Sequence, residues 1–461
     1  MATRYVNIDR DTPLLLPPDL RDWVPADHLV HFVIDAMESV DVQQARVNER
    51  GTGSAQYPPR MLLGLLSYSY ATGIFSSRQI ERQTYENVAV RLLCADTHPD
   101  HDTLCTFRRE NGPLLQSAFA QVLELAARCG VLKVGGVTVA IDGTKILASA
   151  SKHSAVSYAH AGQTMQTLEL EIAELLAKAE QADATPLQDG LTIPAEVQRR
   201  QERKARLARA RAEMEARAYA RCQAEQAEHA AKLAAREALR AAGQKPRGPE
   251  PKAPDPTPGD KDQVNFTDEE SRIMKTKDGF QQSYNAQAAL ETNSRLIVGA
   301  RVSQAPNDKQ ELLPDLAAVN LHVRPAVVLI DSGFASEGAV TAAERDAPAG
   351  STSLLILAAL QREPHGRTVA QLEQRVDPPA PAHDAPFAER MRHRTATTTG
   401  RALYKLRQQT IEPVFGIIKE AMGFRRFSLR GLAKVTLEWD LVTLAYNLKR
   451  LHRLGLAPHT A

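Results

Sequence analysis

Cysteine and aromatic residues are scarce in this chain of 461 residues. There are two tryptophans and 5% aromatic residues, and the four cysteines are too few in this length for a disulfide framework, which favours reduced thiols. No uncharged run approaches the roughly 18 apolar residues of a membrane span, so no membrane partner is expected. The N-terminal segment also lacks the apolar core of a signal peptide. The sequence therefore predicts a cytoplasmic protein.

Net charge is also small, at a formal +2, but the basic residues are unevenly distributed. Between Arg390 and Arg453 there are 14 Lys and Arg against 4 Asp and Glu. A basic region of this density attracts polyanions, and DNA is the usual one. Charge alone leaves open a second explanation, a solvated helical surface without a ligand.

The N-terminal part of the chain is predicted to be helical. Pro58-Pro59 opens one helix, and Ser76-Ser77 caps a second helix over residues 78–93. Two helices joined by a short turn can form a helix-turn-helix that contacts DNA, here through Arg78 and Arg82. Ordinary helical packing explains the same pattern equally well.

Two apolar segments further along the chain are each followed by an aspartate. Residues 137–141 form a predicted strand that ends at Asp142, and residues 326–330 form another that ends at Asp331. Paired strands are predicted over residues 272–302. A carboxylate at the end of a buried strand is suited to metal binding or catalysis, and it is equally suited to capping a turn.

Between these strands lies a block rich in Ala, Glu, Gln and Arg, at residues 164–243. Its pattern predicts a helical hairpin or short coiled coil, broken near Thr185-Pro186 and Asp189-Gly190. The proline-rich residues 244–262 that follow are predicted to be an extended linker.

One carboxylate near the C-terminus stands on a basic helix. Glu412 and Lys419 share a helical face with Phe415 and Gly416, because the spacing is i, i+3, i+4, i+7. A lone acid among cations is usually an ion pair. Three carboxylates beside a basic surface instead suggest a divalent-metal site that acts on a phosphodiester. Two Mg²⁺ ions about 3.5–4 Å apart can activate the nucleophile and stabilise the leaving oxygen.

A zinc site is a competing interpretation for another cluster of ligand-type residues. Cys94, His98, His101 and Cys105 are of the right kinds. Their spacing, C-x3-H-x2-H-x3-C, is not one of the usual zinc patterns. Small buried thiols are therefore favoured over a zinc site.

Taken together, these motifs resemble the DDE transposases of bacterial insertion sequences, and the resemblance extends over nearly the whole chain. Two N-terminal segments, residues 57–63 and 98–108, are similar to the helical domain of that family. Three later segments match the contexts of its catalytic acids: residues 140–145, 329–334 and 411–416. Residues 265–287 are similar to the stretch that leads into its middle strands.

The resemblance implies an α/β fold, an RNase H-like mixed sheet flanked by helices. It implies catalytic and metal-binding roles for Asp142, Asp331 and Glu412, with Mg²⁺ or Mn²⁺ as cofactor. It also implies an all-α N-terminal domain and a coiled-coil-like helical insertion between the first two acids. The predicted division begins with a DNA-binding domain at residues 1–130 and the first part of the catalytic domain at 131–163. The insertion at 164–243 and the linker at 244–262 follow, and the rest of the catalytic domain occupies 263–461.

The family motif Tyr-x2-Arg-x3-Glu-x6-Lys is matched by Tyr404, Arg407, Glu412 and Lys419, except that the gap between Arg407 and Glu412 is one residue longer. On a helix, one extra residue rotates Arg407 by about 100° relative to Glu412. The resemblance implies DNA contacts by Tyr404, Arg407 and Lys419. The basic residues that follow, Arg425 and Arg426, are expected to hold the phosphate backbone.

The activity that the resemblance implies is DNA transposition. The protein would bind the terminal inverted repeats of its own element, cleave the ends and join them to target DNA. Pairing of two ends implies a homodimer on DNA, associated with the bacterial nucleoid. Alternatives are an RNase H-like nuclease without strand transfer, a catalytically silent DNA-binding derivative, and a coiled-coil scaffold built on residues 164–243.

Overall fold

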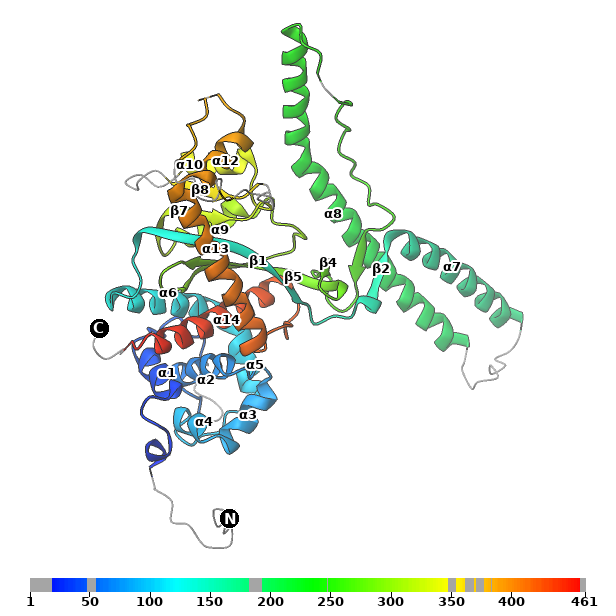
Figure 1. Ribbon diagram of the computed structural model, residues 1–461. Coiled ribbons are helices and arrows are strands. Elements are labelled where there is room, and N and C mark those ends of the chain that lie inside the picture. Colours follow the sequence, from blue (N-terminus) through cyan, green and yellow to red (C-terminus); the bar gives the residue numbers. More distant parts are fainter. Residues whose placement is uncertain are drawn as a thin grey trace, which may run out of the picture.

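The chain folds around one mixed sheet, with the N-terminal helices at one end and a long helical hairpin standing apart from the sheet (Figure 1). The computed structural model describes residues 19–47, 55–181, 193–246, 248–346, 354–360, 369, 377–382 and 384–456. Within these ranges no helix is both long and apolar enough to span a membrane.

The sheet has the strand order β4-β5-β1-β7-β8, with β6 also paired to β5. Its first half is antiparallel, because β5 runs against β1, β4 and β6. Its second half is parallel, because β7 pairs with both β1 and β8 in the same direction. The strands are β1 Gly135–Leu147, β4 Arg272–Thr276, β5 Gly279–Glu291, β6 Ile297–Ser303, β7 Arg324–Ile330 and β8 Leu355–Ala358.

Strand β1 is longer than its apolar pattern predicts. It does not end at Asp142 but continues to Leu147, with Asp142 opposite Ala288 of β5. Its polar half remains in the sheet because β5 supplies a complete antiparallel ladder, and backbone hydrogen bonds do not require apolar side chains. Strand β7 does end at Ile330, directly before Asp331.

The N-terminal helices follow the prediction with one difference. The helix expected over residues 78–93 is two helices, because Asn87 has an extended backbone and its side chain accepts hydrogen bonds from the N–H groups of Ala89 and Val90. This is a new N-cap in the middle of the predicted helix. The elements are η1 Leu20–Trp23, α1 Leu29–Glu38, α2 Pro59–Ala71, α3 Ser77–Glu86, α4 Val88–Leu93, α5 His101–Glu110 and α6 Gly112–Arg128.

Helix α14, Leu432–Arg453, joins these helices to the sheet. It packs against α1, α2, α5 and α6 and also against β6. Buried polar groups lock the junction: Arg108 donates to the Tyr70 hydroxyl at 2.7 Å, and that hydroxyl donates to fully buried Glu438. The N-terminal helices and the sheet therefore share one continuous core.

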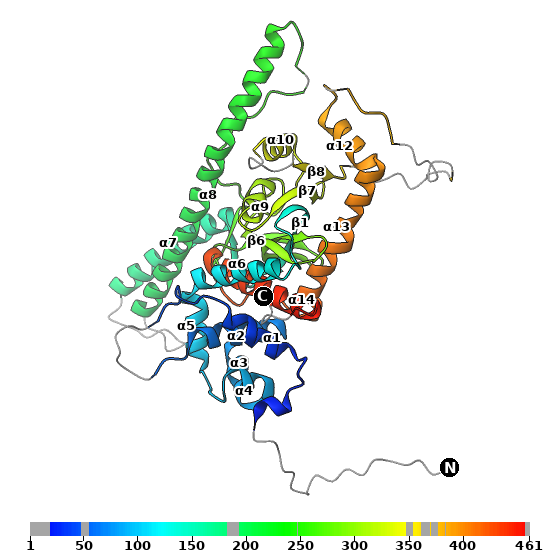
Figure 2. The same cartoon turned by 90° about the vertical axis from the view of Figure 1, so that its left-hand side faces the viewer.

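The second group of helices covers the parallel half of the sheet. Helix α13, Thr398–Gly416, packs across β1 and β7 and continues through a short π-helical turn, Ile417–Ala421 (Figure 2). Residues 425–427 then run beside the end of β1, where the Leu147 N–H donates to the Arg425 carbonyl. Helices α10 Glu337–Arg345 and α12 Phe387–Ala396 pack on β8, whereas α9 Leu312–Val319 packs on β6 and β5 in the antiparallel half.

The inserted hairpin begins earlier than predicted, at Tyr158. Helix α7, Tyr158–Gln181, packs along α8, Ile193–Ala241, and the expected break near Thr185-Pro186 and Asp189-Gly190 lies outside the described residues. At its base β2, Ala155–Ser157, which follows η2, Lys152–Ser154, pairs with β3, Gln263–Asn265.

The proline-rich segment after α8 lies back along the outer part of that helix (Figure 1). The Arg236 guanidinium donates to the Gly248 carbonyl, and Arg240 pairs with Glu250. The insertion is therefore a helical arm with a strap of extended chain along its outer half.

Candidate active site

Two of the three predicted acids come from neighbouring parallel strands. Strands β1 and β7 pair in parallel as far as Ala140 and Leu329, so Asp142 and Asp331 follow the paired segment on each strand. The carboxyl ends of parallel strands meet at the same edge of a sheet, a common location for ligands. These two side chains are 17% and 39% exposed.

Arg407 of α13 connects all three predicted acids. Its guanidinium donates to Asp142 Oδ2 at 2.9 Å. The same guanidinium is 3.9 Å from Asp331 Oδ2 and 3.9 Å from Glu412 Oε1. Its side chain is only 10% exposed, whereas that of Glu412 is 59% exposed. Residues from distant parts of the chain thus meet around one buried cation.

The rotation expected from the longer gap before Glu412 does not take Arg407 away from the site. Arg407 lies on the buried face of α13, and the length of its side chain spans the offset to Glu412. The helix is held in place by the Tyr404 hydroxyl, which donates to the Ile330 carbonyl at 3.1 Å. Tyr404 therefore fixes α13 to the end of β7, next to Asp331.

The charge state of Asp142 is set by its surroundings. Burial raises the pKa of Asp142 to about 6, Arg407 opposes that rise, and Asp331 adds to it. Two carboxylates sharing a site resist simultaneous ionisation, and a nearby cation relieves that resistance. Arg407 is thus the group that favours the charged form of Asp142 in this structure.

Asp331 also has a local structural task. Its Oδ1 accepts hydrogen bonds from the N–H groups of Gly333 and Phe334, at 2.7 and 3.3 Å. This closes the turn after β7, which is the alternative role that the sequence left open. Its second oxygen faces Arg407, so the two roles coexist in one side chain.

Lys419 lies on the same side of β1 as Asp142. Its ammonium group donates to the Thr144 hydroxyl at 2.5 Å and to the Lys145 carbonyl at 3.0 Å. Burial lowers the pKa of Lys419, and repulsion from Lys277 adds to that effect. Its polar contacts are thus made to the end of β1.

The two arginines after the π turn are more exposed. Arg425 donates to the Lys419 carbonyl and pairs with Glu420, and Arg426 forms an isolated bridge with Leu147. The N-terminal candidates are on α3, away from α13 in both views (Figures 1 and 2). Arg82 pairs with Glu86 there, and Arg78 is exposed.

A polar cluster beside Gly143, the neighbour of Asp142, was not predicted from the sequence. Asp308 accepts hydrogen bonds from the side chains of Asn285 and Gln287, at 2.6 and 2.8 Å, and lies 3.9 Å from Lys145. A Cβ atom at Gly143 would lie within 3 Å of the side chains of Asn285, Gln287 and Asp308. Only glycine leaves room for them, and the alternation of Asn285 and Gln287 along β5 was the available signal.

The four zinc-type residues are not brought together. The His98 ring contacts Thr84 and stacks on Tyr85, while His101 pairs with Glu81. The Cys105 thiol contacts Ser77, at 3.0 Å. In the described ranges no group of three or more His, Cys, Asp or Glu is arranged to hold a metal.

The donor set of the acids nevertheless suits a hard cation. Mg²⁺ prefers carboxylate oxygens and usually takes only a few of them. Asp142, Asp331 and Glu412 are such ligands, and the Arg407 guanidinium is the positive charge that they share here. A divalent ion bound by them would have to replace part of this ion-pair network.

Family models match both ends of the chain. A model described as "Transposase domain (DUF772)" matches residues 18–110, and one described as "Transposase DDE domain" matches residues 381–452. No curated protein and no solved structure matches the chain. The second match includes Tyr404, Arg407, Glu412 and Lys419.

Transposase DDE domains belong to enzymes that cleave and transfer DNA, and they generally use a divalent metal. The matches at the two ends confirm the resemblance predicted from the motifs, because each end of the chain is similar to a transposase domain.

Proposed function

We propose that this protein is a DNA transposase that binds the terminal inverted repeats of its insertion sequence, cleaves the ends and joins them to target DNA. The observation that carries the proposal is the meeting of Asp142, Asp331 and Glu412 around Arg407. Three carboxylates from two strands and a later helix supply the ligands that a two-metal phosphoryl transfer requires.

The arrangement of the strands supports an RNase H-like catalytic domain. Three antiparallel strands, β6, β5 and β1, continue into two parallel strands, β7 and β8. Asp142 lies on β1, Asp331 directly follows the adjacent strand β7, and the glutamate lies on the later helix α13. This is the arrangement that the resemblance implies.

Asp142, Asp331 and Glu412 would hold Mg²⁺ or Mn²⁺, which supplies charge stabilisation and a deprotonated nucleophile when bound. Arg407 keeps the carboxylates together, and Tyr404 orients α13. We assign Lys419, Arg425 and Arg426 to the phosphate backbone near the cleaved bond, and Arg78 and Arg82 to the DNA ends. Pairing of two ends requires a homodimer on DNA.

The test is an incubation of the purified protein with a DNA fragment that carries its own gene and flanks, plus a supercoiled target. Cuts at the element ends and joined products, present with Mg²⁺ and absent with EDTA or in Asp142→Asn, are expected. Cuts without joining would assign the protein as a nuclease. Binding without cutting would assign it as a silent DNA-binding derivative.

A further inference from the structure

A pocket lies on the edge of α13 away from Glu412, and no motif pointed to it. It has a volume of about 40 Å³, opens to solvent, and is bounded by α13, α14 and the turn between β5 and β6. Its lining is Arg295, Pro413, Val414, Ile417, Tyr446, Lys449, Arg450 and Arg453. Four of these eight residues are cations, and the lining contains no carboxylate.

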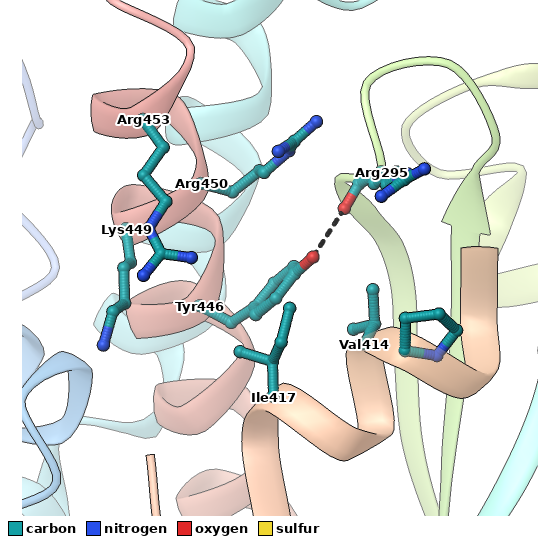
Figure 3. Close-up of a pocket in the computed structure, with 8 residues that line it drawn as sticks. Arg295, Val414, Ile417, Tyr446, Lys449, Arg450 and Arg453 are labelled. Carbon is teal, nitrogen blue, oxygen red and sulfur yellow. Dashed lines mark hydrogen bonds between the residues drawn. The ribbon is translucent and has the colours of Figure 1, made fainter. Parts of the chain in front are cut away.

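The cations are positioned by uncharged groups. The Arg450 Nε donates to the Ser294 carbonyl at 2.8 Å, and the Lys449 ammonium donates to the Ala71 carbonyl at 2.7 Å. The Tyr446 hydroxyl donates to the Arg295 carbonyl at 3.0 Å. Figure 3 shows the Tyr446 ring between the α14 cations and the Arg295 turn. Contacts to carbonyls fix these groups without neutralising their charge.

No described carboxylate forms an ion pair with any of the four cations. Their mutual repulsion is visible in Lys449, whose pKa is lowered by burial and then by Arg453. Like charges gathered in this way cost free energy unless an anion is bound. The arrangement is therefore suited to binding an anion from outside the chain.

The dipole of α14 explains only part of the cluster. Cations are favoured in the last turn of a helix, where Arg450 and Arg453 stand. Arg295, however, belongs to the β5–β6 turn and has a left-handed backbone, with φ of 59°. A non-glycine residue at such a φ is uncommon, and here it adds a further cation to the pocket from a separate element.

We propose that this pocket binds a backbone phosphate of DNA, beyond the residues already assigned to DNA contact. The inference rests on the proposed function, because DNA is the polyanion that a transposase holds. Pro413, which lines the pocket, follows Glu412 directly on α13. One helix would thus present a catalytic carboxylate on one edge and a phosphate site on the other.

The test uses Arg295→Gln/Arg453→Gln in the full chain, because neither side chain makes a hydrogen bond or ion pair among the described residues. The charge-matched control is Lys133→Gln/Lys434→Gln, which removes two exposed lysines elsewhere. Binding to a short duplex is measured between 50 and 200 mM salt. For each phosphate that the protein neutralises, this fourfold rise in salt concentration lowers the affinity about 3.5-fold.

We expect the salt slope of the pocket variant to fall by about 0.9, the value for one phosphate, and that of the control to stay at the wild-type value. Equal changes in both variants, or no change in either, would overturn the proposal. A third outcome would also overturn it. If inorganic phosphate at matched ionic strength stabilises only the wild type, while the salt slopes of DNA binding stay equal in all variants, the ligand of the pocket is a free anion.

The same proteins separate this proposal from the proposed function. If the salt slopes of the wild type and the pocket variant differ as expected, but the wild type never cleaves its element ends with Mg²⁺, the proposed transposase function is refuted and the phosphate pocket is retained. Cleavage and joining with unchanged slopes in the pocket variant would refute only the pocket. Wild type that binds no duplex at 50 mM salt would refute both.

Discussion

The two edges of α13 hold cations in opposite ways. On one edge Arg407 is nearly buried and lies within ion-pair distance of three carboxylates. On the other edge Arg295, Lys449, Arg450 and Arg453 line a pocket whose polar contacts are to carbonyl oxygens. All of these cations except Arg295 belong to the basic segment between Arg390 and Arg453, and Arg295 lies against it. The density of charge along the sequence therefore does not distinguish the two sets.

The role of a cation in this protein therefore depends on what neutralises its charge. Arg407 is neutralised by the protein itself and therefore organises the acids. The pocket cations keep their charge and therefore attract a ligand from outside. A count of Lys and Arg along the sequence treats both sets alike, and only the distribution of carboxylates in space separates them.

The largest effect is expected at the acid edge. Glu412→Gln should reduce Mg²⁺-dependent cleavage by at least about 100-fold, because even partners behind metal ligands contribute 10–100-fold. Binding of duplex DNA should be retained. End cleavage by this variant is measured together with that of a control, Glu420→Gln. Glu420 is an exposed acid on the π turn that pairs with Arg425. Equal activity of the two variants would remove Glu412 from the site.

Arg407→Ala tests whether that cation organises the acids. Removing it leaves Asp142 partly buried and without its counter-ion, so the free energy of unfolding should fall by about 1–3 kcal/mol, less than for a fully buried pair. Denaturant unfolding measures this, and Lys405→Ala on an exposed position of α13 is the control. If both variants unfold at the same denaturant concentration, the network around Arg407 contributes nothing to stability.

Asp440 provides a third case, a buried carboxylate without a cation. Burial raises its pKa to about 7, and its side chain accepts one hydrogen bond, from Gln116. The folded state therefore binds the proton more tightly than the unfolded state, and wild-type stability should fall as pH rises from about 4 through 7. Asp440→Asn should make this slope shallower, leaving the part due to other buried acids such as Asp142, and should gain on the order of 1 kcal/mol above pH 7.

Thermal or denaturant unfolding at pH 5 and pH 8 measures the difference. Asp346→Asn, which changes an exposed acid paired with Arg345, is the control and should keep the wild-type pH dependence. An Asp440→Asn protein that loses stability with rising pH as the wild type does would show that other groups cause the slope.

The smallest effect is expected for Lys419→Ala. Its ammonium group already donates to Thr144 and Lys145, so it has less capacity for phosphate than the pocket cations. The salt slope of duplex binding should fall by at most about 0.9, the value for one phosphate. A drop larger than that of Arg295→Gln/Arg453→Gln would reverse the ranking of the two edges.

Much of the fold follows from local patterns. The apolar segments before Asp142 and Asp331 form neighbouring strands, and the block of Ala, Glu and Arg forms a helical hairpin. The continuation of β1 to Leu147 could not be read from hydrophobicity, because its polar half is held by the ladder with β5. The split at Asn87 depends on a capping hydrogen bond that competes with the helix.

The candidate site divides in the same way. Asp142, Asp331, Glu412 and the excess of cations near the C-terminus could be recognised from local sequence, because strand ends, helical spacing and charge are local properties. That Arg407 meets those acids, and that Arg295 joins the cations of α14, is visible in the folded chain alone. The physical reason is that both gatherings need contacts between segments distant in the chain, which packing of α13 and α14 against the sheet alone provides.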